Sequence, residues 1–151
     1  MKFEHKVVVE APVATVRAFL DDFRKASACV PGLESVEEVE PDVYDGRVKV
    51  KIGPLGIGIQ GRATVQRDAE AWRVKGEGRD RRIGAGVNAN VEAKLIELTP
   101  QTTEMQMLAD VQFSGRLAEL GQPLIKKKAD AFVAEFTQNL QKAIAKEETP
   151  A

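Results

Sequence analysis

Hydrophobic and polar positions alternate at the start of the chain. The apolar face of residues 2–9 carries Phe3, His5, Val7 and Val9. This period of two is typical of a strand with one buried face. Beyond Pro12 the apolar positions recur every three or four residues, so we predict an amphipathic helix over residues 12–23. The Pro31–Gly32 pair then predicts a turn, with Cys29 beside it.

Residues 34–113 show repeated alternation and no helical stripe. The alternation predicts an antiparallel meander with one wet face and one covered face. Its expected turns lie at Pro41–Asp42, Asp45–Gly46, Asp68–Ala71 and Pro100–Gln101.

The C-terminal part of the chain supplies the expected cover for that sheet. Apolar residues recur at helical spacing over residues 123–145, which predicts one helix of about 35 Å at about 1.5 Å per residue. Pro123 marks either the start of this helix or a kink after a preliminary turn at 116–120. Residues 146–151 are expected to form a disordered polar tail.

These elements together predict a single α+β domain over residues 1–145. The element order is β-α-(α)-β(5-6)-α, which favours the helix-grip fold. In that fold a curved antiparallel sheet, here of about six to seven strands, wraps around a long C-terminal helix.

Composition narrows the classes of function. The chain has 151 residues, with 22 Lys and Arg against 23 Asp and Glu, which suits one soluble domain. A formal net charge of -1, with both signs scattered, argues against nucleic acid as a partner. One Cys and one His form neither an internal disulfide nor a Cys/His zinc site, so we expect no metal and no resident cofactor. No apolar run approaches the ~18 residues of a membrane span, and we expect a cytoplasmic protein.

A glycine-rich segment matches a nucleotide-binding pattern. Residues 56–61 read GxGxxG, but the residues that follow are strand-like, so no helix N-terminus is expected to bind a phosphate. A bend or β-bulge where the sheet curls is the favoured interpretation. The overlapping segment 54–57 could instead form a mobile apolar lip at a cavity mouth.

Few residues suggest acid–base chemistry. A lone inward His such as His5 is more often a hydrogen-bonded core residue than a general base. Tyr44 is expected to pack at a strand end with its hydroxyl in water. Because no nucleophile is visibly paired with either residue, we predict no catalytic residue.

Two basic clusters occur, at Arg79–Arg82 and at Lys126, Lys127 and Lys128. Each is typical of a solvated surface. The lysine run could also dock an acidic partner or an anionic membrane surface, with about 1 kcal/mol per lysine at best.

Small residues are frequent on the expected strands, namely Gly76, Gly78, Gly84, Gly86, Ala89, Ala93 and Ala109. Opposite flexible methionines, they leave space that an apolar molecule could fill, although a plainly filled core is an equal alternative. The expected cavity lining combines inward strand positions with the stripe of the last helix: Val50, Ile52, Leu55, Ile57, Trp72, Val91, Met105, Met107, Phe113, Leu124, Phe132 and Phe136.

Three segments resemble a known family: CVPGL at 29–33, KIGPLG at 51–56 and FSGRLAELGQPLI at 113–125. They resemble CoxG, the family of the G subunit of carbon monoxide dehydrogenase, within the START-like (SRPBCC) helix-grip superfamily. The resemblance implies a non-catalytic accessory protein that serves a molybdenum hydroxylase of the carbon monoxide dehydrogenase type. It also implies a bound hydrophobic molecule, with a respiratory quinone or a lipid as candidates.

The resemblance implies a role in coupling the enzyme to the membrane. Because the long C-terminal extension of some relatives is absent from this sequence, we expect only weak, transient contact with the inner face of a membrane. Two alternative functions remain open. One is an adaptor or maturation factor with no physiological ligand, and the other is a small cyclase- or dehydratase-like enzyme that uses His5 or Tyr44.

Overall fold

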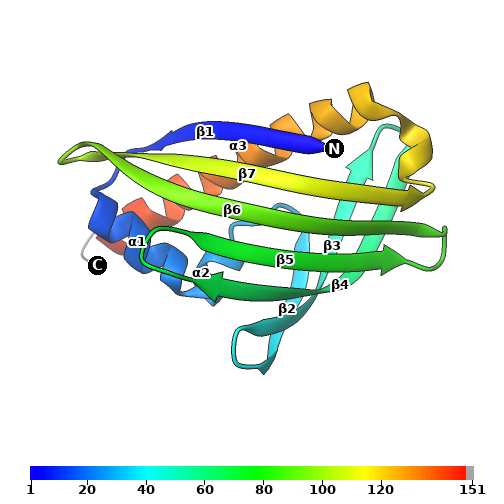
Figure 1. The fold of residues 1–151 in the computed structure, drawn as a ribbon, viewed down its shortest axis with the longest axis horizontal. Helices are drawn as coiled ribbons and strands as arrows, with labels where there is room; N and C mark the ends of the chain where they lie inside the picture. Colours follow the sequence, from blue (N-terminus) through cyan, green and yellow to red (C-terminus); the bar gives the residue numbers. More distant parts are fainter. Residues whose placement is uncertain (149–151) are drawn as a thin grey trace.

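The computed structural model describes residues 1–148 and shows a curved sheet with a long helix behind it (Figure 1). The elements, in chain order, are β1 (Lys2–Val9), α1 (Val13–Asp21), α2 (Phe23–Ser27), β2 (Leu33–Glu40), β3 (Val43–Ile52), β4 (Leu55–Arg67), β5 (Trp72–Asp80), β6 (Ala85–Thr99), β7 (Thr102–Gly115), the 3-10 helix η1 (Ala118–Leu120) and α3 (Gln122–Glu148). The seven strands are antiparallel and lie in the order β1-β7-β6-β5-β4-β3-β2. The predicted helix-grip α+β fold is confirmed.

The sheet has one face toward α3, here called the inner face, and one toward solvent. The inner face of β1 carries Phe3, His5, Val7 and Val9, as predicted from their alternation. On β6 the odd-numbered residues from Ala85 to Leu95 point inward, whereas the asparagines Asn88 and Asn90 point outward. The sheet is therefore wet on one face and covered on the other.

The helix predicted over residues 12–23 is interrupted. Asp22 has an extended backbone (φ -92°, ψ 97°), and its carboxylate accepts hydrogen bonds from the Arg24 and Lys25 amides. An aspartate in this role begins a helix rather than continuing one. Phe23 therefore opens α2 instead of closing α1.

The expected turns need two corrections. Asp45–Gly46 lies inside β3 rather than at a turn, because the hairpin before it closes at Pro41–Asp42. Residues 56–61 are regular β4, paired with β3 without a register shift, so the expected bulge is absent there. The tight turn lies just before them, where Gly53 adopts a φ of +57°, a conformation that favours glycine.

Turn geometry also accounts for part of the CVPGL segment. Gly32 has a φ of +79°, and a Cβ at this position would lie 2.1 Å from the carbonyl oxygen of Lys49. Only glycine, which has no Cβ, fits so close to the β3 backbone. The turn at residue 32 therefore requires glycine.

The structure answers the question left open at Pro123, namely whether this residue starts the last helix or kinks it after a preliminary turn. The preliminary turn exists as η1, and Pro123 is the second residue of α3, where a missing amide hydrogen costs nothing. The helix continues to Glu148, so residues 146–148 are helical rather than part of a disordered tail. The rest of the predicted tail, 149–151, lies outside the described residues.

The core is divided into two clusters at opposite ends of α3. Cluster 1 joins α1, β1, β7 and the C-terminal half of α3, with Val16, Phe19, Met105, Leu140 and Ile144 among its buried residues. Cluster 2 joins the β3–β4 hairpin, β6, η1 and the start of α3 around Ile52, Ile57, Ala85 and Leu117. The most extensive backbone contacts of α3 are with β1, β3 and α1 rather than with the central strands of the sheet.

Candidate ligand site

Between the two clusters, the inner face of the sheet carries small side chains. On β6 the residues between cluster 2 and cluster 1 are Ala89, Val91 and Ala93. Strand pairing places Ala89 beside Gly76 of β5, which pairs in turn with Ala63 of β4. We call Ala63, Gly76 and Ala89 the small-residue row. Such a row facing a helix leaves room that larger side chains would fill.

Two glycines on the inner face of β5 show where that room lies. A Cβ at Gly76 would have only the Arg62 carbonyl oxygen within 4 Å, at 3.9 Å, and no side chain. A Cβ at Gly78, two residues further on the same face, would lie 2.4 Å from the Cγ2 atom of Ile59. The inner face is therefore filled at Gly78 and unfilled at Gly76.

The middle of α3 lies opposite this region. Ala129, Phe132 and Val133 are half-buried and lie between Leu124, which packs against cluster 2, and Phe136, which packs against cluster 1. Their spacing of three and four residues puts them on the stripe that faces the sheet. An aromatic ring, a branched side chain and a small residue thus form the helix side of the unfilled region.

His5 closes one margin of the region. Its Nε2 atom lies 2.9 Å from Oδ1 of Asp130 on α3, which joins the edge strand β1 to the helix. This hydrogen bond lowers the pKa of the Asp130 carboxyl below its ordinary value. The geometry agrees with a hydrogen-bonded histidine that helps to hold two elements together.

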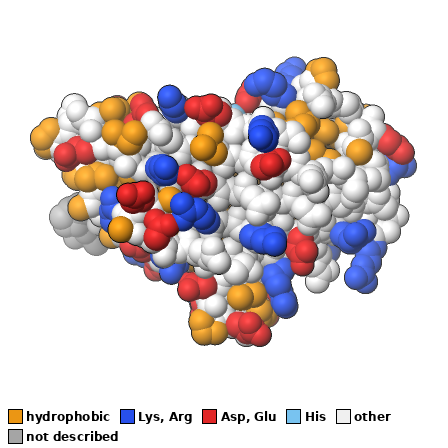
Figure 2. Space-filling view, in the orientation of Figure 1, with side chains coloured by type: hydrophobic (Ala, Val, Ile, Leu, Met, Phe, Trp, Pro, Cys, Tyr) orange, Lys and Arg blue, Asp and Glu red, His pale blue; other side chains and the backbone are white. Residues whose placement is uncertain are grey.

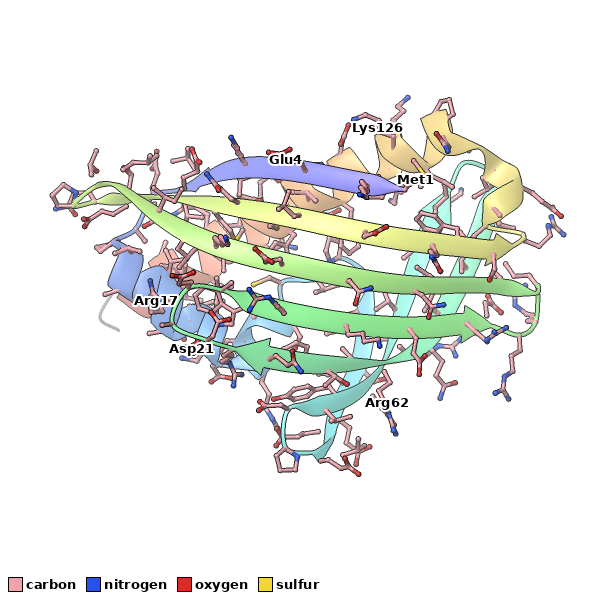
Figure 3. The ribbon with its side chains drawn as sticks, in the orientation of Figure 1. Met1, Glu4, Arg17, Asp21, Arg62 and Lys126 are labelled. Carbon is pink, nitrogen blue, oxygen red and sulfur yellow. The ribbon has the colours of Figure 1, made fainter. Side chains whose placement is uncertain are left out.

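Lys128 lies near the other margin. It is half-buried, one helical turn after Leu124, whose Cδ2 atom would lie 3.1 Å from a Cβ at Gly53 in the β3–β4 turn. Residues four apart share one side of a helix, so Lys128 lies on the same side of α3 as Leu124. Lys127 is exposed, and Lys126 is exposed and ion-paired with Asp130 at 3.6 Å. The three lysines predicted as one docking patch therefore point in different directions (Figure 3 labels Lys126 on the upper side of α3).

Most of the twelve predicted lining residues belong to the two clusters rather than to the middle. Met105 is buried in cluster 1, and Met107 and Phe136 pack against it. Ile52 and Ile57 are buried in cluster 2, and four others pack against it: Val50, Leu55, Phe113 and Leu124. Only Val91 and Phe132 face the region between the clusters. Within the segment 54–57, Ile57 is 2% exposed and lies in the core, whereas Pro54 and Gly56 are exposed.

Trp72 faces inward but is held by α1. Its indole Nε1 donates a hydrogen bond of 2.8 Å to the Asp21 carboxylate, and the Arg17 guanidinium lies 5.7 Å from the ring centroid (Figure 3 labels both α1 residues). A tryptophan fixed on both its polar atom and its ring face mainly fastens α1 to β5.

Tyr44 differs from its expected position in water. Its ring is 7% exposed and stacks on Phe23, with ring centroids 4.0 Å apart. Burial is the main reason why the pKa of Tyr44 is raised. Cys29 is also buried, beside the turn as expected, and burial raises the pKa of its thiol.

The basic cluster at Arg79–Arg82 has a structural component. The Asp80 carboxylate is 6% exposed and accepts hydrogen bonds from the Gly58 amide at 2.9 Å and the Arg82 amide at 3.0 Å. The Gly58 amide is the main reason why the pKa of Asp80 is lowered. The first residues of β4 have no partner on β5. The Asp80 carboxylate serves there as the hydrogen-bond acceptor instead.

Two grooves cross the outer face, away from the small-residue row. One, of about 750 Å³, is lined by charged residues of both signs, including Lys2, Glu4 and Arg73, and by apolar residues such as Leu108. The other, of about 550 Å³, contains Arg62 paired with Asp45 at 2.7 Å. Figure 2 shows both charges interspersed over this face. Because their rims are charged and open to water, these grooves suit an apolar ligand less well than the inner face does.

Two sequence expectations concern metals and membranes. Within residues 1–148, no group of three or more His, Cys, Asp or Glu side chains is placed to hold a metal ion. In the same range, no helix is long and apolar enough to cross a membrane.

A family model for CoxG, the G subunit of carbon monoxide dehydrogenase, matches residues 6–145. The chain belongs to this family. The resemblance carried by the three sequence segments is thereby confirmed, and the CoxG match spans every strand and helix of the fold except the first residues of β1 and the end of α3.

Solved structures share the fold at low sequence identity. A conserved protein from Geobacillus kaustophilus has a TM-score of 0.89 at 20% identity, over 97% of this chain and 97% of that one. A START superfamily protein from Mycobacterium smegmatis has a TM-score of 0.72 at 16% identity, over 97% and 98%. The aromatase/cyclase Zhui from Streptomyces sp. R1128 has a TM-score of 0.58 at 18% identity, over 97% and 92%. A comparison with curated protein sequences gave no match.

The structure also brings together residues that the sequence patterns did not connect. The sequence patterns put Ala63 on an inward strand face and Lys128 in a surface lysine run, and they mark Gly76 and Ala89 as small. The missing signal was strand register, because only pairing shows that Ala63, Gly76 and Ala89 form one row.

Proposed function

We propose that this CoxG-family protein binds one apolar small molecule between the small-residue row and the middle of α3. The unfilled inner face above Gly76 is the observation that carries the proposal. Burial of apolar ligand surface there would supply about 25 cal/mol per Å². A respiratory quinone or a lipid is the candidate ligand, and a molybdenum hydroxylase of the carbon monoxide dehydrogenase type is the enzyme that the protein would serve.

A binding function fits the side chains better than a catalytic one. The imidazole of His5 is engaged by Asp130, and Tyr44, which pairs with Ala63 at one end of the small-residue row, is stacked on Phe23 and hydrogen-bonded to Glu38. The inner face between the clusters otherwise carries alanine, glycine, valine and phenylalanine. General acid–base catalysis needs a titratable group free to reach the substrate, whereas His5 and Tyr44 are each engaged by another side chain.

Direct binding of a headless apolar probe tests the proposal. Diphenylhexatriene, which fluoresces when it leaves water, should bind the protein saturably and near one-to-one. Gly76→Val places a side chain in the unfilled space and should abolish that signal. Gly56→Val is the matched control, because a Cβ at Gly56 also meets nothing within 4 Å but lies on the outward side of β4. No saturable binding to the wild-type protein, or equal binding by both variants, would contradict the proposal.

An adaptor function is the second candidate, and the distribution of charge favours it. Lys51, Arg81 and Lys127 lie around the cluster 2 end of the molecule, and none belongs to an ion pair within residues 1–148. Figure 2 shows positive side chains gathered at the right-hand and upper right parts of the visible face. Such an end could dock an acidic enzyme surface or, more weakly, an anionic membrane.

Charge reversal separates docking from ligand binding. Lys51→Glu, Arg81→Glu and Lys127→Glu together should remove co-elution with the partner enzyme while diphenylhexatriene still binds. Lys6→Glu, Lys142→Glu and Lys146→Glu together, away from this end, change the net charge by the same amount and are the control. Co-elution that survives the triple change would exclude this end as the docking site.

A further inference from the structure

The region between the two clusters contains almost no polar side chains, but Lys128 lies at its margin. Lys128 is half-buried, whereas its neighbours Lys126 and Lys127 are exposed. Along the inward stripe of α3, Leu124 precedes it and Phe132 follows it by one turn each. A lysine between two such residues packs its methylene stem on apolar surface and keeps its ammonium group at the edge.

The ammonium group of Lys128 has no ion pair or hydrogen-bond partner among residues 1–148. This contrasts with three other polar groups of the same helix. Lys126 is paired with Asp130, the Thr137 hydroxyl donates to the Val133 carbonyl at 2.8 Å, and Asn139 donates to the Cys29 carbonyl at 3.0 Å. Lys128 is thus a half-buried donor of α3 that the described part of the fold does not use.

The two margins of the region also differ in chemistry. At the β1 margin, His5 and Asp130 satisfy each other. At the β3 margin, Lys128 lies on the same side of α3 as Leu124, which packs against cluster 2. Among residues 1–148, Lys128 is therefore a donor without a partner that a ligand with one polar group could reach from the interior.

We propose that Lys128 holds the polar head of the ligand, and that this head is an oxygen acceptor at one end of an otherwise apolar molecule. This inference rests on the proposed function and narrows the class of ligand. A carboxylate and a quinone carbonyl are two sources of the same acceptor chemistry. A cationic head is excluded by charge, and a wholly apolar molecule gains nothing from Lys128.

Three probes with different heads test the role of Lys128. They are cis-parinaric acid with a carboxylate, decylubiquinone with carbonyl oxygens, and diphenylhexatriene with no head. Lys128→Met keeps the apolar stem and removes the charge, Lys128→Arg restores a cation, and Lys127→Met is the control on the exposed neighbour.

The expected result is a loss of about tenfold in affinity for at least one oxygen-bearing probe on Lys128→Met, which corresponds to one charge-assisted hydrogen bond. Lys128→Arg should recover most of that loss, whereas Lys127→Met and the diphenylhexatriene affinity should stay within about twofold of the wild type. A loss with cis-parinaric acid alone identifies a carboxylate head, and a loss with decylubiquinone identifies a quinone carbonyl.

Two results would overturn different claims. If Lys128→Met binds all three probes as the wild type does, Lys128 does not hold the head and this inference is wrong. If the wild-type protein binds none of the three, the interior takes no apolar ligand and the proposed function itself is wrong. Thermal unfolding of each variant shows whether a lost signal reflects loss of the fold.

Discussion

The unfilled space above Gly76 makes a prediction about stability that needs no ligand. Gly76→Val adds three carbon atoms on the inner face of β5, where no side chain lies within 4 Å of the new Cβ. At about 0.8 kcal/mol per buried carbon group, their burial is worth about 2 kcal/mol. Fixing the valine side chain costs about 0.5 kcal/mol of conformational entropy. Replacing a glycine within a strand regains about the same amount, because the unfolded chain then has less backbone freedom to lose.

We therefore expect Gly76→Val to stabilise the protein by about 1–2 kcal/mol, since the added carbons remain in part accessible to water. For a chain of this size, that is a rise in the melting temperature of about 3–6 °C. Calorimetry or thermal unfolding followed by circular dichroism measures it directly.

Gly78→Val is the contrasting variant on the same strand and face. Its Cβ would lie 2.4 Å from Ile59 Cγ2, so overpacking should destabilise the protein by about 1–3 kcal/mol. If Gly76→Val were destabilised as much as Gly78→Val, the space above Gly76 would be filled in solution, and the argument for a ligand there would fail.

Three further predictions concern the polar groups that hold the elements together. Thr103 is fully buried and donates to a backbone carbonyl at 2.8 Å, so Thr103→Val should cost about 1–3 kcal/mol in thermal unfolding by leaving that carbonyl unpaired. His5→Phe should raise the pKa of Asp130 toward its ordinary value in a carboxyl NMR titration. In the wild type, the stability linked to this lowered pKa is present above the ordinary carboxyl range and is lost as pH falls through the lowered pKa. Asp80→Ala should speed amide hydrogen exchange at Gly58, and unchanged exchange would show that the 2.9 Å hydrogen bond does not protect it.

The fold could be predicted because its signals are local and periodic. Alternation over β6 and β7 and the helical stripe of α3 each run for more than a dozen residues, which is long enough to distinguish strand from helix. The errors fall where a single side chain decides the backbone. Asp22 ends one helix by capping the next, and Asp45–Gly46 has turn-like residues inside a paired strand.

The site was harder to predict because apolar residues that face inward have two possible roles. Periodicity assigned Met105 and Ile57 to the inner face correctly, yet both are buried in clusters that close the ends of the fold. Whether an inward residue packs or lines a space depends on what lies opposite, which is set by strand register and by the path of α3. The positions that matter are small residues, and a glycine in a sequence does not reveal whether its missing side chain leaves room.

The division of the core gives a physical reason for an interior that stays open. Cluster 1 fastens the C-terminal half of α3 to β1 and α1, and cluster 2 fastens its start to the β3–β4 hairpin. With both ends of the helix fixed, its middle cannot move down onto the sheet to fill the space above Ala63, Gly76 and Ala89. Collapse there would have to unpack Leu140 at one end or Leu124 at the other, which costs more than the small residues could return. Residues that stabilise the fold are thereby separated from residues free to contact a ligand, and substitutions in the middle should alter binding without unfolding the protein.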